Sequence, residues 1–302
     1  MNRYVLICTI VILITSCKNQ PTYDYFGQTE PSNTSEVFAK GIISLDGRYE
    51  QNIAFSPDAT ECILVISEKH WNSFTMLKAT YQKNSWSSFD TISFSKNVNA
   101  TLEPFYTPDS KQVYFTSNAF PSTQKWDTDI WRVSREKNNW SSPVRLDSLI
   151  NKGGKFSRQW FPSISEHGNL YYVIADTVQT DIYMASQKGD GFLEPIKLSN
   201  AINSNKMEWE PLIAPDESFL LFASRHRKDS YGGQDFYVSF KDSKNEWGEA
   251  IHLGKEINSE YMEQSPSFSP DGKYLFFGRL NTKTWKCDLH WINISFLDKY
   301  RK

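Results

Sequence analysis

The chain has few of the residues that define several common protein classes. Lys and Arg (33 together) balance Asp and Glu (35 together), so the basic excess typical of nucleic-acid-binding proteins is missing. Four cysteines occur in 302 residues, and two of them, Cys8 and Cys17, fall in an apolar N-terminal segment. Cys62 and Cys287 alone cannot form a disulfide framework. They leave open either one bridge or two buried free thiols.

Common catalytic and metal-binding motifs are also missing. The five histidines show neither HxH nor HExxH spacing, and a zinc site would need several of them to converge. The sequence contains no glycine-rich phosphate loop, no GxSxG sequence and no SxDxGxTW box. We therefore expect no cofactor and no metal ion, and no residue is assigned a catalytic role from a motif.

Long apolar runs are absent except at the N-terminus. Residues 4–14 are apolar but too short for a spanning helix, and two polar residues, one of them basic, precede them. The following Ile14-Thr15-Ser16-Cys17 resembles the lipobox of bacterial lipoproteins. That resemblance implies a signal peptide over residues 1–17 and a lipidated Cys17. The alternative is an ordinary secretory signal with an incidental cysteine.

The location of the protein follows from the same segment. Lys18 after the lipidated position, by resemblance to lipoprotein sorting signals, implies a lipid anchor in the outer membrane of a bacterial envelope. Residues 18–36 are rich in Asn, Gln, Thr, Ser and Pro, which predicts a flexible tether. Whether the protein faces the periplasm or the exterior stays open.

A short phrase built around Pro-Asp recurs along the rest of the sequence. Taking one acidic residue as a marker in each copy, the copies follow one another at intervals of 50 to 57 residues, which suits one four-stranded propeller blade per repeat. The markers are Asp58, Asp109, Glu166, Asp216 and Asp271, the third belonging to a degenerate copy.

Later landmarks keep the same spacing. In three repeats an Asp before an apolar residue (Asp129, Asp181 and Asp235) is followed 11 or 12 residues later by an aromatic and six further on by Leu. Each repeat reads as strand a, a Pro-Asp turn, strand b, a loop, strand c, a hairpin and strand d. The b strands are apolar on both faces, which is typical of a strand between two packed sheets.

The repeat count predicts an all-β, five-bladed β-propeller over residues 37–294, with six blades as the alternative. The fifth repeat lacks a d strand, and the apolar residues 37–43 could pair as that strand and close the ring. Residues 295–302 are left as a C-terminal tail.

These repeats resemble the Pro-Asp propeller repeat of TolB-like, WD-repeat-like proteins over residues 37–294. The resemblance implies the architecture and says little about function, because propellers host binding proteins, hydrolases and lyases alike. The N-terminal α/β domain of TolB and any OmpA-like domain have no counterpart here, so the partners of TolB are not implied.

A ligand site is expected where the b to c loops, which vary most in length, meet the starts of the a strands. Residues six and eight positions before each marker lie on one side of a regular strand, because the offsets differ by two. With arginines and loop residues after the b strands they form a predicted mouth. Its predicted ligand-binding residues are Glu103, Arg158, Trp160, Glu208, Trp209, Glu210, Arg225, Arg227, Tyr231, Glu263 and Arg279.

Two functions fit this mouth. The first is a non-enzymatic envelope module that binds a protein, a peptide or a saccharide through charged and aromatic groups. The second is a carbohydrate-active enzyme in which two of Glu103, Glu208, Glu210 and Glu263 act as acid and base. Such an enzyme needs carboxyl groups about 5–10 Å apart with unequal pKa values. In a third interpretation each Glu has a purely structural role and joins a strand to a neighbouring loop.

Overall fold

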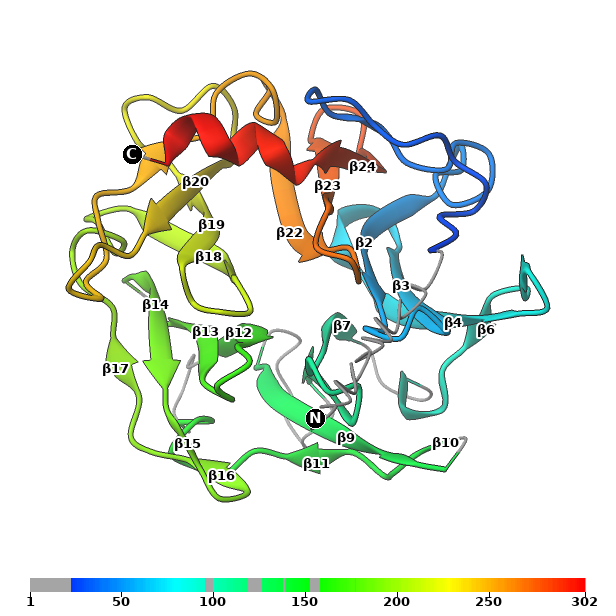
Figure 1. The fold of residues 1–302 in the computed structure, drawn as a ribbon, viewed down its shortest axis with the longest axis horizontal. Helices are drawn as coiled ribbons and strands as arrows, with labels where there is room; N and C mark the ends of the chain where they lie inside the picture. The colour runs from blue at the N-terminus through cyan, green and yellow to red at the C-terminus, as the bar shows by residue number, and fades with distance from the viewer. Residues whose placement is uncertain are drawn as a thin grey trace, which may run out of the picture.

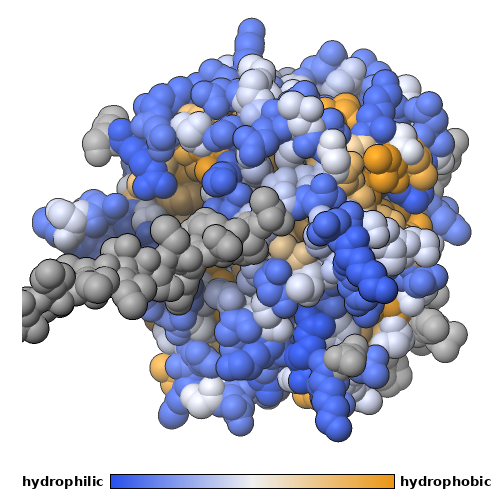
Figure 2. All heavy atoms as spheres, turned by 45° about the vertical axis from the view of Figure 1, so that its right-hand side comes forward, coloured by the Kyte–Doolittle hydropathy of each residue, from blue (hydrophilic) through white to orange (hydrophobic). Residues whose placement is uncertain are grey.

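The computed structural model describes residues 23–95, 100–118, 127–137, 139–152, 158–176 and 178–301. The expected signal peptide and Cys17 lie outside these residues. Figure 1 shows an all-β fold in which the sheets are arranged around a common centre, as in a propeller. Mainly hydrophilic residues cover the face seen in Figure 2, with scattered hydrophobic ones between them.

Antiparallel three-stranded meanders follow one another along the described residues. The meanders are β2 (Tyr49–Phe55), β3 (Glu61–Ser67) and β4 (Phe74–Gln82); β7 (Thr101–Tyr106), β8 (Gln112–Ser117) and β9 (Asp129–Glu136); β12 (Arg158–Ile164), β13 (Leu170–Ala175) and β14 (Thr180–Ala185); β18 (Met207–Ile213), β19 (Phe219–Arg225) and β20 (Asp235–Phe240); and β22 (Met262–Phe268), β23 (Tyr274–Asn281) and β24 (Lys286–Asn293).

Shorter elements complete the sheets. A two-residue outer strand pairs with the third strand of the first four meanders: β6 (Asp90–Thr91), β11 (Val144–Arg145), β17 (Ile196–Lys197) and β21 (Ile251–His252). The remaining elements are β5 (Ser85–Trp86), β10 (Asn139–Trp140), β15 (Gln187–Lys188), β16 (Gly191–Phe192) and the 3₁₀ helices η1 (Lys69–Trp71), η2 (Ser93–Ser95) and η3 (Ile294–Tyr300).

The middle strand of each meander is buried because sheets pack on both of its sides. Val173 of β13 and Phe222 of β19 are fully buried in one apolar cluster, and Phe236 of β20 meets Phe277 of β23 with ring centroids 5.6 Å apart. These contacts join successive meanders. Burying side chains of this size stabilises a fold by about 1.5–3 kcal/mol each, so packing between sheets holds the arrangement together.

The Pro-Asp turns join the first and second strands as predicted. Asp58 accepts hydrogen bonds from the Ser56 hydroxyl (2.6 Å) and the Thr60 amide (3.1 Å), and the residue after the Asp has a positive φ. In the first copy the Ala59 amide donates a hydrogen bond to the Ser56 carbonyl, two residues before Asp58. In the degenerate copy the Gly168 amide donates to the Ser165 carbonyl in the same way, so His167 stands at the Asp position. Choosing Glu166 as marker displaced the third repeat by one residue.

The N-terminal segment pairs with the last meander, though over a shorter length than predicted. The strand β1 (Glu36–Val37) is antiparallel to β24, and the Phe38 amide donates to the Leu289 carbonyl at 2.8 Å. Beyond Phe38 the backbone turns, because Ala39 and Gly41 adopt positive φ values of 43° and 81°. The expected strand over residues 37–43 is therefore mostly a turn.

Residues on either side of the meanders are packed rather than free. Tyr25, expected within the tether, is buried, and its hydroxyl donates to Asp271 at 3.1 Å. At the other end η3 (red in Figure 1) buries Phe296 and Leu297. The described part of residues 18–36, and the tail after residue 294, therefore belong to the folded body.

The structure decides between the two alternatives for Cys62 and Cys287. Cys62 and Cys287 are both buried and unpaired, so the free-thiol alternative is confirmed. Across residues 23–301, apart from the undescribed gaps, no helix is long and apolar enough to cross a membrane.

Candidate functional site

The innermost strands share a bulge that decides where their side chains point. The pairing register of each shifts once, for example between Leu102 and Phe105 in β7. In four of them the bulged residue has a positive φ: Glu103 (59°), Phe161 (57°), Glu210 (57°) and Ser265 (50°). Each stands directly before a proline, which cannot donate to a sheet ladder and occurs inside sheets mainly at bulges.

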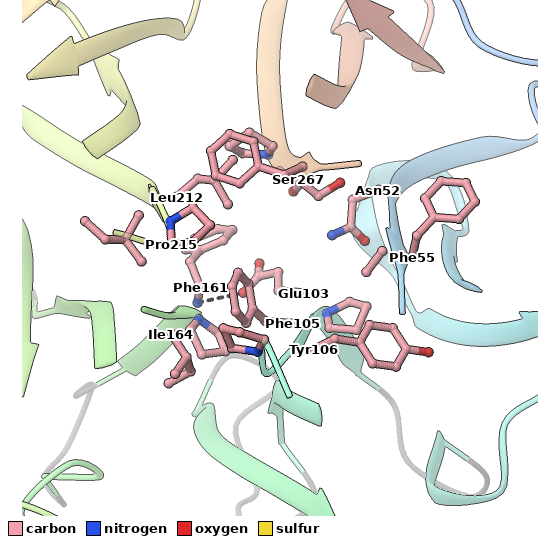
Figure 3. Close-up of a pocket in the computed structure, with 18 of the residues that line it drawn as sticks. Asn52, Phe55, Glu103, Phe105, Tyr106, Phe161, Ile164, Leu212, Pro215 and Ser267 are labelled. Carbon is pink, nitrogen blue, oxygen red and sulfur yellow. Dashed lines mark hydrogen bonds between the residues drawn. The ribbon is translucent and has the colours of Figure 1, made fainter. Parts of the chain in front are cut away.

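The bulged residues meet at a central cavity of about 230 Å³. Its lining includes Glu103, Phe161, Glu210, Ser265 and Asn52, together with prolines of the Pro-Asp turns. Aromatic and aliphatic side chains of the inner strands complete the lining. Figure 3 shows Glu103 extending toward the middle of this cavity, among Asn52, Phe161, Leu212 and Ser267.

Glu103 reaches the cavity from β7. Its Oε2 accepts hydrogen bonds from the Thr116 hydroxyl (2.8 Å) and from the Phe161 amide of the next meander (2.9 Å; dashed in Figure 3). Burial raises the pKa of this carboxyl well above its ordinary value, and the nearby charge of Glu210 raises it further. The two hydrogen bonds oppose that rise.

Glu210 occupies the matching position on β18. Its Oε2 accepts from the Ser265 amide of the following meander (2.7 Å) and from the Gln234 side chain (3.1 Å). Burial raises the pKa of Glu210 to about 7, while these donors and the positive charge of Arg225 lower it. In both residues Oε1 has no hydrogen-bond partner among the described residues and is not sealed from solvent.

The other predicted glutamates lie in buried ion pairs instead. Glu208 contacts Arg227 at 2.9 Å and Glu263 contacts Arg279 at 2.8 Å, and both carboxylates are fully buried. Serine hydroxyls and amides supply further donors, such as the Ser259 hydroxyl to Glu263 at 2.5 Å. Glu208, Arg227, Glu263 and Arg279 thus form two buried ion pairs, and none of the four lines the cavity.

Four further predicted residues form a ladder beside the bulges. The rings of Trp160 and Trp209 stack with centroids 5.0 Å apart, Arg158 lies 5.5 Å from the ring centre of Trp160, and Arg225 lies 5.3 Å from that of Trp209. Arg225 also donates to Gln234 at 2.7 Å, and Gln234 in turn donates to Glu210. All four ladder residues are partly exposed, and none lines the cavity.

Tyr231 lies apart from both groups. Its half-exposed ring packs edge-on against His252 at 4.6 Å, and its amide donates to Asp235. The predicted mouth therefore separates into a cavity pair, two ion pairs, a ladder and this loop contact. Offsets of six and eight residues place side chains on one side only in a regular strand, and here the bulge begins at the position six residues before the marker.

Neither Phe161 nor the bulge was among the predictions from the sequence. The signal was present, because Pro104, Pro162, Pro211 and Pro266 stand at matching places inside strands that should otherwise exclude proline. Aligning on these prolines puts Phe161, rather than Trp160, in the column with Glu103 and Glu210.

Another repeated group proved structural. Asn151 accepts a hydrogen bond from the Ile130 amide and donates to the carbonyls of Ile130 and Leu146. Asn203 and Asn258 make the same contacts to their own third strands at Ile182 and Phe236. No group of three or more metal-ligating side chains occurs in the described ranges.

Comparison with known proteins bears on the fold. No family model matches the sequence, and no curated protein matches it. A solved structure described as "Glycoside hydrolase" is similar with a TM-score of 0.55 at 8% identity, over 87% of this protein and 90% of that one. A structure described as a complex of BT0996 and RGII is similar with a TM-score of 0.51 at 8% identity, over 87% and 88%.

A third likeness is weaker. The alpha-L-arabinofuranosidase PaAbf62A from Podospora anserina, in complex with cellotriose, gives a TM-score of 0.49 at 10% identity, over 88% of this protein and 98% of that one. At such identities the first two likenesses support the propeller fold alone. They do not single out the TolB-like proteins.

Proposed function

We propose that the protein cleaves a saccharide in the central cavity, with Glu103 as general acid and Glu210 as general base. One observation carries the proposal. Two buried carboxyl groups from different meanders line the same cavity, each has one oxygen without a hydrogen-bond partner among the described residues, and burial raises the pKa of both. Paired carboxyl groups with shifted pKa values in one cavity are typical of acid–base catalysis.

The roles follow from the protonation states. Glu103, whose pKa burial raises well above its ordinary value, is the group that gives its proton to the glycosidic oxygen as the bond from that oxygen to the anomeric carbon breaks. Glu210, partly ionised near neutral pH, takes a proton from the water whose oxygen bonds to the anomeric carbon. Amides from the next meander hold both carboxyl groups in place.

The size of the cavity limits the substrate. About 230 Å³ is below the roughly 300–1,000 Å³ of most small-molecule sites, so we infer that a terminal sugar enters rather than the middle of a long polymer. The "Glycoside hydrolase" neighbour gives the proposal a precedent on a related fold, but the carboxyl pair is what supports it here.

The architecture we propose around this site is a closed ring of five blades, one per meander. Pairing of β1 with β24 and of Tyr49 in β2 with Cys287 in β24 supports closure between the first and last meanders. We further propose that lipidation at Cys17 anchors the ring to a bacterial outer membrane.

The test is product release from a panel of oligosaccharides by the full-length protein in detergent. We expect terminal sugars to be released by the wild type, and Glu103→Gln and Glu210→Gln to lower the rate by at least about a hundredfold each. Glu194→Gln, at an exposed site, is the matched control and should leave the rate unchanged. Equal rates in all four proteins would overturn the proposal.

A non-enzymatic binding module is the second candidate. It is favoured by the fact that one oxygen of each cavity carboxyl already ties its strand to the next meander, as a structural group would. Under this function no oligosaccharide is cleaved, and a ligand recovered from the envelope stays intact on the protein.

A further inference from the structure

The arginines of the described residues differ in their partners. Arg48, Arg135, Arg145, Arg227 and Arg279 lie within about 3 Å of a carboxylate. Among the others, Arg132 donates to the Asp190 carbonyl, and Arg158 and Arg225 have no acidic side chain within salt-bridge distance. All 35 Asp and Glu residues of the protein are among the described residues.

Arg225 is the more unusual of the two because it is largely withdrawn from water. Its Nε donates to Gln234 at 2.7 Å, and its remaining guanidinium nitrogens have no hydrogen-bond partner among the described residues yet are not sealed from solvent. Glu210 is the carboxyl whose charge acts most strongly on Arg225. Gln234 accepts a hydrogen bond from Arg225 and donates one to Glu210, so it bridges the two side chains. A guanidinium held in this way costs free energy unless a counter-charge arrives.

The surroundings of the two arginines add a second element. The stacked rings of Trp160 and Trp209 lie between Arg158 and Arg225, and both rings are partly exposed. One face of each indole lies against the other indole and an arginine approaches each ring, so a ligand meets the exposed ring edges. A guanidinium binds a carboxylate through two parallel hydrogen bonds. Cation and aromatic surface therefore lie together in one place.

We propose that the ladder of Arg158, Trp160, Trp209 and Arg225 is a binding site for an acidic saccharide, separate from the cavity. Arg225 takes a sugar carboxylate, the indole edges contact the sugar ring, and Arg158 meets a second carboxylate farther along an oligomer. An acidic peptide could satisfy the arginines but would make less use of the indoles.

The proposal is tested by calorimetric titration of the full-length protein with a trimer of galacturonic acid. Its methyl ester, which keeps the sugar rings and removes the charges, is the matched neutral probe. We expect the acid to bind at least about tenfold more tightly than the ester, because a hydrogen bond to a charged group contributes roughly that much or more. Binding of both probes with equal affinity, or of neither, would overturn the site.

Substitutions at Arg225 test whether the trimer binds at the ladder. Arg225→Gln should weaken binding of the trimer by about tenfold to a hundredfold, and Arg225→Lys should recover only part of the loss, because an ammonium cannot form the paired hydrogen bonds. Near-ultraviolet circular dichroism shows whether each variant is folded. If a folded Arg225→Gln protein bound as tightly as the wild type, the site would be wrong.

Two further measurements distinguish this proposal from hydrolysis in the cavity and from binding of an acidic peptide. Glu103→Gln removes the proposed acid from the cavity and should leave binding of the trimer intact, so hydrolysis and ladder binding can fail independently. A glutamate-rich peptide that bound more tightly than the trimer would replace the saccharide with a protein ligand and overturn the proposal.

Discussion

Glu208 and Glu210 stand two residues apart on one strand and have opposite surroundings. Glu208 is an ion-paired carboxylate enclosed by Arg227 and two serine hydroxyls. Glu210 has no cation in contact and lines a cavity. It accepts hydrogen bonds from the Ser265 backbone amide and from the side-chain amide of Gln234. Glu263 is surrounded like Glu208, and Glu103 like Glu210.

The bulge at Glu210 produces the contrast. In a regular strand both side chains would share a face, but an extra residue in a left-handed conformation rotates one of them toward the axis. A guanidinium lies in contact with the first carboxylate. The second has no cation in contact, and burial raises its pKa. One residue type thus gains two chemical roles.

The largest expected effect comes from removing the carboxylate of an ion pair. Glu263→Ala should lower the free energy of unfolding by about 3–5 kcal/mol, because it leaves the Arg279 guanidinium partly buried and unpaired. Urea denaturation measures the loss. Glu103→Gln, at the other position, should cost clearly less, and if the two costs were equal the comparison would fail.

The pH dependence of stability distinguishes the two positions next. Burial raises the pKa of Glu210 to about 7 from 4.5, so its carboxyl stabilises the fold below pH 4.5 and this contribution is lost as pH rises through 7. Between those values the wild type should lose on the order of 3 kcal/mol relative to Glu210→Gln. Urea midpoints across this range measure the difference, and parallel curves would contradict it.

Hydrogen bonds to the two kinds of carboxyl should differ in strength. Ser259→Ala removes a hydroxyl from the ion-paired Glu263 and should cost about 1.5–3 kcal/mol, as for a bond to a charged group. Thr116→Val removes the hydroxyl at Glu103 and should cost about 0.5–1.5 kcal/mol. Thermal or urea unfolding of the pair checks the order. The reverse order would mean that Glu103 is the charged one.

The smallest expected effect is on a pKa alone. Arg225→Gln removes a positive charge that lowers the pKa of Glu210, so that pKa should rise. Carboxyl ¹³C NMR follows the titration directly. Arg158→Gln is the control, since Arg158 is not among the groups that shift Glu210, and an equal rise in both variants would assign the effect to general charge.

Much of the fold can be predicted from the sequence. The Pro-Asp spacing predicts the turns and the order of strands, and the turns at Asp58 and Asp271 have the expected hydrogen bonds. The apolar second strands predict burial on both faces, which the full burial of the adjacent Leu221 and Phe222 in β19 confirms. These features are local or periodic, so neighbouring residues are enough to specify them.

The candidate site is predicted less well. Glu103 and Glu210 are on the predicted list, but so are Glu208 and Glu263, and only the register of pairing separates the two sets. Prolines mark the bulge in the sequence without saying which way the backbone rotates there. The packing of residues 23–36 depends on Tyr25 meeting Asp271, a contact across most of the sequence.

The sequence by itself determined the repeat, the strand order and the buried middle strands, because each follows from turn chemistry and the alternation or continuity of apolar residues over short distances. Tertiary structure alone decided which carboxyl groups face the cavity and which arginines lack a counter-charge. The protonation and pairing of each group depend on neighbours contributed by other meanders, and those neighbours come within reach only after the sheets have assembled around their common centre.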